Sequence, residues 1–292
     1  MSALTTSSTK DQAAAKSPSP APLARPNPWL AVGMLCWREM IRFFRQRNRV
    51  VGAIGQPVLF WLLFGAGFQR SFRVGESGET SFLAYYFPGT LMLILLFTAI
   101  FATISIIEDR REGLLQGVLI APCPRWSMVL GKVLGGTLIA LLQGLIFLAL
   151  ALVIQVSMSV TSALLLTVLM FVAGIALTSL GVVIAWRMDS TQGFHAIMSV
   201  LLMPMWLLSG AFFPVPALGI DANWSEVALH WVMRLNPLTY AVSGARHLVG
   251  GVSGDMWSSS ATMCWIVTCG FAVVMFAAAW WIAGRRTSGD AT

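Results

Sequence analysis

Six long apolar runs, separated by short polar segments, dominate the pattern of this 292-residue chain. The runs contain no Asp or Glu and cover residues 50–69, 83–107, 129–154, 160–186, 194–213 and 261–283. An α-helix rises about 1.5 Å per residue and the hydrocarbon core of a bilayer is about 30 Å thick, so about 20 apolar residues span it. The pattern therefore predicts an all-α integral membrane protein with six transmembrane helices.

A different pattern precedes the first run, over residues 29–49. Apolar residues recur at steps of three and four on one helical face, and they are Leu30, Met34, Trp37, Ile41 and Phe44. Arginines follow the same spacing on another face, at Arg38, Arg42, Arg45 and Arg49. This spacing predicts a basic amphipathic interfacial helix in the headgroup layer. Such a helix would either anchor the chain on anionic lipids or act as a lever between a cytosolic partner and the first span.

Two short helical stretches are predicted before the last run, at residues 225–235 and 237–249. In the first stretch, Glu226, His230 and Arg234 form a polar strip at spacings of four residues. Both stretches are too short to span a bilayer. We therefore expect re-entrant or interfacial helices that cap the outer mouth, since re-entrant backbone is tolerated where it is buried in protein or lines a cavity.

The composition agrees with a membrane protein. Hydrophobic residues make up 57% of the chain and charged residues 11%, whereas soluble domains carry about 25% charged residues. With six spans, 15 of the 19 Lys and Arg residues lie on one side, and only Arg70, Arg73, Arg234 and Arg246 lie on the other. Cytoplasmic loops are enriched in Lys and Arg, so both termini are predicted to be cytoplasmic. The net charge of +7 then reflects the inner loops, and no nucleic-acid partner is expected.

The same pattern divides the chain into three parts. Residues 1–28 are rich in Ser, Thr, Ala and Pro and predict a disordered cytoplasmic tail. Residues 29–286 form the membrane domain, and residues 287–292 are a short cytoplasmic tail.

No pattern of conventional catalysis is found. Lys132 follows Gly131, but Val133 stands where a phosphate-binding loop needs Ser or Thr. No metal-ligand set, cofactor motif or paired carboxylate occurs within the runs, so we expect no catalytic residue, metal or cofactor. Lys132 lies near a cytoplasmic end, where it is expected to snorkel to water. A transporter without an ATP site or ion relay would need a partner that supplies energy.

The segment between the second and third runs is unusual for an idle loop. It begins with the charged residues 108–112, continues with apolar residues at helical spacing, including Leu114, Leu115 and Val118, and ends at Pro122 and Pro124. Exposed apolar surface beside charges favours docking onto another protein. The alternative is a solvated helix end, where exposed ion pairs contribute about 0–1 kcal/mol.

Three motifs, in their order relative to the runs, give the chain a family resemblance. They are EDRREGLLQGVLIAPCPRWSMVLGK at residues 108–132, the segment around Pro204, Trp206, Ser209, Gly210, Phe213 and Pro214, and Leu235–Asn236–Pro237 followed by Tyr240. Over about residues 29–286 the chain resembles the type 2 ABC exporter permeases, in the branch of drug-resistance and polysaccharide or nodulation-factor export subunits.

The resemblance implies a permease subunit of the bacterial cytoplasmic (inner) membrane that forms the translocation path among membrane lipids. ATP would be hydrolysed by a separate ATP-binding cassette subunit, and a second permease subunit would complete the transporter, as a homodimer or with a similar chain. The residues implied in coupling to the ATPase are Glu108, Arg110, Arg111, Gly113, Leu114, Leu115, Val118 and Arg125. A second cytosolic contact would lie at residues 187–192.

On the outer side, the resemblance suggests that Asn236, Pro237 and Tyr240 belong to a gate or re-entrant segment, although an ordinary turn with an interfacial Tyr would look the same. Pro204 and Gly210 would kink the fifth run along the pathway. The apolar, aromatic character of the runs favours amphiphilic or lipid-linked cargo. Two other classes remain open: a non-transporting membrane scaffold or assembly factor, and a secondary carrier.

Overall fold

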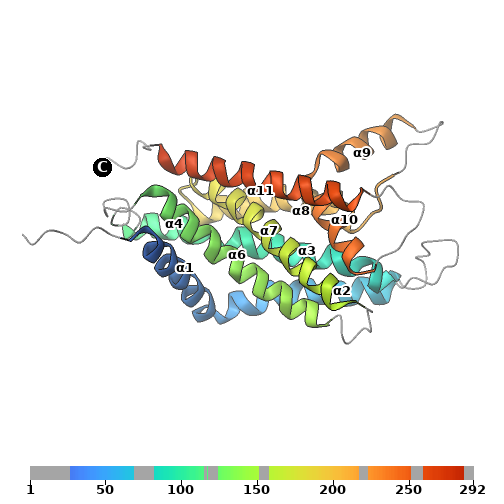
Figure 1. Ribbon diagram of the computed structural model, residues 1–292, viewed down its shortest axis with the longest axis horizontal. Helices are drawn as coiled ribbons and strands as arrows, with labels where there is room; N and C mark the ends of the chain where they lie inside the picture. The colour runs from blue at the N-terminus through green and yellow to red at the C-terminus, as the bar shows by residue number, and fades with distance from the viewer. Residues whose placement is uncertain are drawn as a thin grey trace, which may run out of the picture.

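The computed structural model describes residues 27–68, 82–114, 117, 124–150, 158–216, 223–250 and 259–285. Within these ranges every regular element is a helix, as predicted, and the long helices run side by side along the long axis of the molecule (Figure 1). Both predicted tails lie almost wholly outside the described residues. The helices are α1 Pro28–Arg45, α2 Arg47–Phe68, α3 Phe82–Ala102, α4 Ile104–Arg111, α6 Arg125–Leu150, α7 Val160–Ala185, α8 Thr191–Trp206, the π-helix η1 Leu207–Ala211, α9 Trp224–Leu235, α10 Pro237–Leu248 and α11 Ala261–Gly284.

Five helical stretches in the described part of the chain are long and apolar enough to cross a bilayer, and they coincide with the second to sixth predicted runs. They are Tyr85–Arg111, Arg125–Ala149, Val160–Ala185, Thr191–Ala211 and Ala261–Gly284. Helix α2 occupies the first predicted run and has Pro57 inside it. The protein therefore has several membrane-crossing helices, and the count of six stays a prediction.

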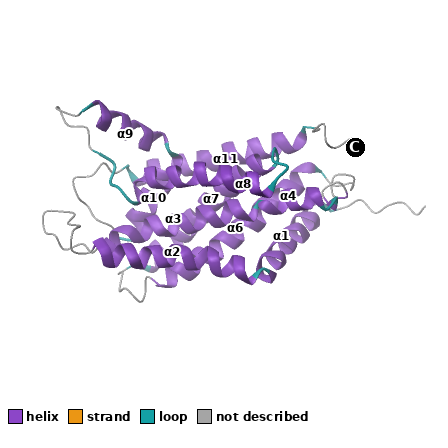
Figure 2. Cartoon of the chain, turned by 180° about the vertical axis from the view of Figure 1, so that it is seen from behind, coloured by secondary structure: helices purple, strands orange, loops and turns teal. Residues whose placement is uncertain are grey.

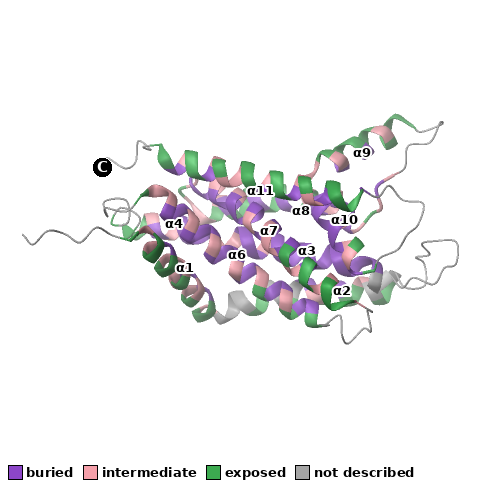
Figure 3. Cartoon of the chain, viewed as in Figure 1, coloured by how far each residue is buried: buried purple, intermediate pink, exposed green. Residues whose placement is uncertain are grey.

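The core of the bundle is built around α3. This helix packs against α2, α6 and α7, and most of its side chains are buried (Figure 3). In contrast, α11 leaves apolar side chains such as Val273, Val274 and Trp281 exposed along its outer face. Apolar side chains on an outer helical face suit lipid, because a bilayer is the solvent that they match.

Helix α1 packs along α6 with its polar edge turned inward. Arg38, Glu39 and Arg42 face the bundle, whereas the predicted apolar face, from Leu30 to Phe44, is exposed. This orientation fits a helix whose apolar face contacts lipid. Its location in the headgroup layer stays a prediction. The predicted stretch 29–49 is also interrupted, because α1 ends at Arg45 and α2 begins at Arg47.

Gly135 allows the close approach of α1 to α6. A Cβ atom at this position would lie 2.8 Å from Cβ of Glu39 and 3.5 Å from Cα of Cys36. Small residues at such crossings bring helix backbones together in membrane proteins. The contact brings Glu39 beside Lys132, which precedes Gly135 by about one turn of α6.

Two predicted runs are not continuous helices. The second run breaks at Thr103, and α4 then carries the charged residues 108–111 as an extension of the span. The fifth run changes to the π-helix η1, in which Leu208 and Gly210 have non-helical dihedral angles. Beyond this break, α9 projects from the bundle, whereas α10 packs against α3, α7 and α11 (Figure 2).

Candidate functional site

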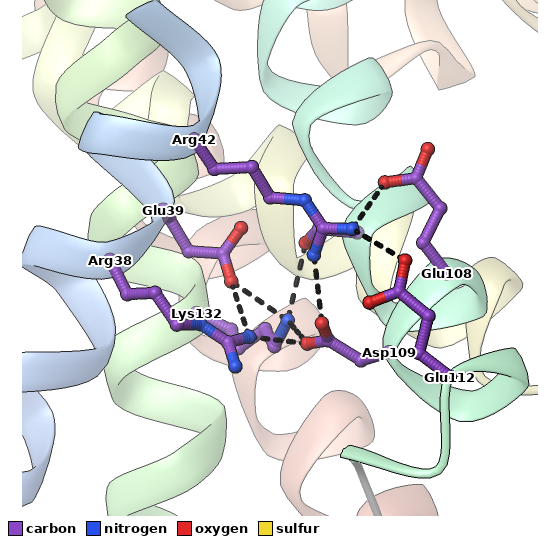
Figure 4. A network of polar contacts seen from close by, with 8 residues as sticks. Arg38, Glu39, Arg42, Glu108, Asp109, Glu112 and Lys132 are labelled. Carbon is purple, nitrogen blue, oxygen red and sulfur yellow. Dashed lines mark hydrogen bonds and ion pairs between the residues drawn. The ribbon is translucent and has the colours of Figure 1, made fainter. Parts of the chain in front are cut away.

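At the end of the bundle formed by α1 and α4, seven charged side chains form one cluster, which we call the inner network (Figure 4). Its members are Arg38, Glu39, Arg42, Glu108, Asp109, Glu112 and Lys132. Helix α1 supplies the first three, α4 and the residue after it supply the acidic triplet 108, 109 and 112, and α6 supplies Lys132. The inner network therefore ties the predicted lever helix to the predicted coupling segment.

Lys132 is the buried centre of the inner network. Its Nζ atom lies 2.8 Å from Oε1 of Glu39, 2.5 Å from Oδ2 of Asp109 and 3.2 Å from Oγ of Ser105. The residue is only 8% exposed, so the expectation that Lys132 snorkels to water is wrong. Two buried carboxylates compensate its charge, and pairing of this kind is required when charges leave water.

Arginines of α1 complete the bonding of Asp109. Arg38 donates to Oδ2 of Asp109, and Nη1 of Arg42 donates to Oδ1 at 2.8 Å. Arg42 also forms an ion pair with Glu108, with 2.9 Å between Nη2 and Oε2. The carboxylate of Asp109 therefore contacts three cations from two helices other than its own.

Glu39 is ionised in this environment. Burial raises the pKa of Glu39, but the charge of Lys132 and hydrogen bonds from Lys132, Ser105 and Arg38 outweigh burial, so the pKa lies below its usual value. The carboxylate is therefore a fixed negative charge at neutral pH, and α1 is held to α6 by an ion pair.

Acid is expected to weaken this connection. Because the pKa of Glu39 is lower in the folded chain than its ordinary value of 4.5, the stabilisation is complete above that value and is lost as the pH falls below it. Thermal unfolding of the detergent-solubilised protein at neutral pH and at about pH 3.5 measures the loss. The Glu39→Gln variant should lose less stability over the same interval, and an equal loss in both proteins would contradict the assignment.

Arg110 and Arg111 hold the turn between α7 and α8. Nη2 of Arg110 donates to the carbonyl of Trp186 at 2.6 Å, and Nη1 lies 3.3 Å from Oδ1 of Asp189. Nε of Arg111 donates to the carbonyl of Asp189 at 3.1 Å. The structure thus joins the predicted coupling segment to the turn that was predicted as the second cytosolic contact.

The other predicted coupling residues have different environments. Arg125 donates to the carbonyls of Ala283 and Gly284 at 3.1 and 2.8 Å, and so caps the end of α11. Gly113 has a φ of +73°, which favours glycine, and Leu114 is 49% exposed. Leu115 and Val118 lie outside the described residues. The contact of all these residues with an ATPase stays a prediction.

A cavity of about 400 Å³ lies between α2, α3 and α8. Its lining is almost wholly apolar and aromatic, with Thr98 and His195 as polar exceptions. Oγ1 of Thr98 donates to Oε1 of the buried Gln143 at 2.5 Å. A cavity with this lining suits an apolar or amphiphilic molecule, because it offers large buried contact area and few polar partners.

Four aromatic rings contact one another beside this cavity, and we call them the outer aromatic cluster; three of them, Phe64, Trp206 and Phe212, line the cavity. They come from Phe64 of α2, Tyr86 of α3, Trp206 of α8, and Phe212, which follows η1. Ring centroids of Phe64 and Phe212 lie 5.3 Å apart, and those of Tyr86 and Phe212 5.6 Å, both edge to face. Edge-to-face pairs stabilise such contacts beyond the burial of area.

The predicted outer residues meet at the helix break. Nδ2 of Asn236 donates to the carbonyl of Met205 at 2.5 Å, and Oδ1 caps α10 by accepting from the N–H of Leu238. Pro237 is the first residue of α10, and Tyr240 is buried within it. Pro204 lies in the last turns of α8, and Gly210 has a φ of +76° within η1. Their role in a gate or pathway stays a prediction.

Sequence reasoning missed the most buried members of the inner network. Glu39 stands among arginines and was hidden by their periodicity, and Asp109 was passed over in favour of its neighbours 108, 110 and 111. The one available signal was Lys132, the only Asp, Glu, Lys or Arg residue inside any of the six runs. A charge at such a position usually has a buried partner.

The fold is a bundle of membrane-crossing helices with an apolar cavity and a charged cluster at one end. The ABC-2 type transporter family model matches residues 31–249, which is more than half of the chain, so the protein belongs to that family. It is a permease subunit of an ABC transporter, and in this family ATP hydrolysis resides on a separate subunit.

Curated relatives agree with this assignment. The chain is 25% identical over 230 residues to the ycf38 protein of Cyanophora paradoxa, covering 78% of this chain and 76% of that protein. It is 22% identical over 228 residues to the inner membrane transport permease YadH of Escherichia coli K12, covering 77% and 85%. It is also 25% identical over 230 residues to nodulation protein J of Rhizobium leguminosarum bv. viciae, covering 73% and 79%.

Proposed function

We propose that this chain is the path-forming half of an ATP-driven exporter of the bacterial inner membrane. It would have six spans with both termini in the cytoplasm, and it would pair with a second copy of itself. Export of an amphiphilic or lipid-linked molecule would proceed along the cavity between α2, α3 and α8. The inner-membrane location is supported by the similarity to the inner membrane transport permease YadH of Escherichia coli.

The observation that best supports this proposal is the inner network, because its ion pairs link α4 to α1 and to α6. Force applied to α4 by an ATP-binding subunit would reach α1 through Asp109 and Arg42, and α6 through Lys132. The arginines that follow Asp109 would move the turn at Asp189, where α8 begins. One push at the inner end would thus displace α8, which lines the cavity, and α1, which directly precedes the lining helix α2.

Leu114 is the sharpest probe of the contact with the ATP-binding subunit. Charge reversal at Glu108 would also break its pair with Arg42, whereas Leu114 is exposed and follows the network in sequence. Leu114→Asp should abolish the stimulation of ATP hydrolysis by the permease while the thermal midpoint of the permease stays unchanged, because surface substitutions usually alter stability by less than about 0.5 kcal/mol.

The measurement is ATP hydrolysis in proteoliposomes that contain the permease and its cognate ATP-binding subunit. Leu235→Asp is the matched control, because it changes an exposed leucine on the predicted outer side, which the ATP-binding subunit cannot reach. Full stimulation with Leu114→Asp, or equal loss with Leu235→Asp, would contradict the coupling role. Cargo movement without any ATP-binding subunit would favour a secondary carrier, and no stimulation by the unaltered permease would favour a scaffold.

A further inference from the structure

The helix is broken at η1, and side chains donate to backbone carbonyls on this segment. Leu208 (φ −89°, ψ 17°) and Gly210 (φ +76°, ψ 4°) depart from helical geometry, so the regular pattern of N–H to carbonyl bonds is interrupted there. Carbonyls in the apolar interior of a membrane protein need other donors.

Helix α10 and its N-cap residue supply two such donors from one side. Nδ2 of Asn236 donates to the carbonyl of Met205 at 2.5 Å, and Nη2 of Arg246 donates to the carbonyl of Gly210 at 2.9 Å. The hydroxyl of Thr239 lies 3.4 Å from the carbonyl of Leu208, but it donates to the carbonyl of Met233 at 2.6 Å. This side of α10 therefore packs along the broken segment.

Arg246 is the charged member of this set. Its guanidinium carbon lies 4.4 Å from the centroid of the Tyr85 ring, and the hydroxyl of Tyr85 is 3.5 Å from the same Gly210 carbonyl. A guanidinium that is partly buried against an aromatic face and a carbonyl loses its hydrogen bond if the carbonyl moves. Both of these partners of Arg246, the Gly210 carbonyl and the Tyr85 ring, are neutral groups.

The segment that Arg246 holds carries two of the four rings of the outer aromatic cluster. Trp206 precedes η1 and Phe212 follows it. Nε1 of Trp206 donates to the carbonyl of Gly89 in α3 at 2.9 Å, and a Cβ atom at Gly89 would lie 2.7 Å from Cβ of Ala211. The contacts of Trp206 and Phe212 with Tyr86 of α3 therefore depend on η1 staying against α3.

We propose that Arg246 is a positioning residue that latches the outer gate: it holds η1 against α3 through the Gly210 carbonyl, and its release lets the outer aromatic cluster part. This latch rests on the proposed function, because it closes the path of the cavity. The Tyr85 ring fixes the guanidinium, and Asn236 holds the end of α8 beside α10.

The test measures opening of the gate without transport. Leu207 lines the cavity beside the cluster, so Leu207→Cys, in a chain whose four native cysteines are replaced by alanine, reports entry of a membrane-impermeant thiol reagent from the outer side. The full chain is used in proteoliposomes with its ATP-binding subunit and without nucleotide. Arg246→Met should increase the labelling rate about 10- to 100-fold, which is the range expected for losing a hydrogen bond from a charged donor.

Three further variants separate a latch from a general structural role. Arg246→Lys should restore part of the slow labelling, because it keeps the charge and a donor. Arg234→Met, which changes an arginine of the neighbouring helix α9 stacked on Trp231, should leave the rate unchanged. A cysteine at Ala176, buried in α7, should stay unlabelled throughout.

Unchanged labelling in Arg246→Met would overturn the latch, and so would equal labelling at Ala176→Cys, which would indicate unfolding. Neither result bears on the proposed function, because stimulation of ATP hydrolysis by the unaltered permease is measured separately. Conversely, accelerated labelling in Arg246→Met would support the latch even if the chain failed to stimulate its ATP-binding subunit.

Discussion

Replacing Lys132 with methionine is expected to destabilise the folded chain by about 3–5 kcal/mol. The substitution preserves the length of the side chain but removes the cation that lies 2.8 Å from Glu39 and 2.5 Å from Asp109. Two buried carboxylates would then face each other with fewer compensating charges, and each would need water or a proton. The free energy of unfolding in detergent, measured by denaturant titration, checks this value.

A double-mutant cycle separates loss of the ion pair from loss of packing. Glu39→Gln removes the charge of the partner while keeping its shape, so the combined Lys132→Met and Glu39→Gln variant leaves less uncompensated charge than Lys132→Met alone. We expect the two destabilisations to be non-additive by at least about 1 kcal/mol. Additive effects would show that Lys132 and Glu39 do not stabilise each other.

The second large effect on stability is expected when a larger side chain replaces the glycine at the crossing of α1 and α6. Gly135→Val should destabilise the chain by about 1–3 kcal/mol and force α1 away, because even a Cβ atom there would lie 2.8 Å from Glu39. Separation of the two helices would also draw Glu39 away from Lys132. The inner network would thus be broken without changing any of its side chains.

The half-buried Cys36 is a native reporter of this movement. Its Cα atom lies 3.5 Å from the position that a Cβ atom at Gly135 would occupy, so thiol labelling of Cys36 should become faster in the Gly135→Val variant. Gly270→Val is the matched control, because a Cβ atom at Gly270 in α11 meets nothing within 4 Å. Unchanged labelling of Cys36 would contradict the proposed role of Gly135.

Local features of the sequence predicted the helices well. The run at residues 160–186 became α7 Val160–Ala185, and the run at 261–283 became α11 Ala261–Gly284. Their ends follow from neighbouring residues, since Ser159 and Ser260 cap the two helices through their hydroxyl groups. Length, hydropathy and capping are local properties, so they can be recognised without knowing which helices touch.

The candidate site was only partly predictable. The charged segment at 108–111 and the outer residues around Asn236 were selected from motif order. The ion pairs and hydrogen bonds that hold these residues in place, however, join distant parts of the chain. Arg42 and Asp109 are 67 residues apart, and Glu39 and Lys132 are 93 residues apart. Periodicity on α1 marked its arginines as a basic face and could not indicate that Arg38 and Arg42 turn inward to Asp109.

The sequence by itself determined that this protein is a bundle of membrane-crossing helices with a charged segment after the second run, because about 20 consecutive apolar residues satisfy their backbone polar groups in a bilayer only as helices. Tertiary structure alone decided which charges are buried and which donors serve the broken helix at Gly210. Those outcomes depend on the approach of α1 to α6 and of α10 to η1, and buried polar groups take their partners from whatever the packing brings within hydrogen-bond distance.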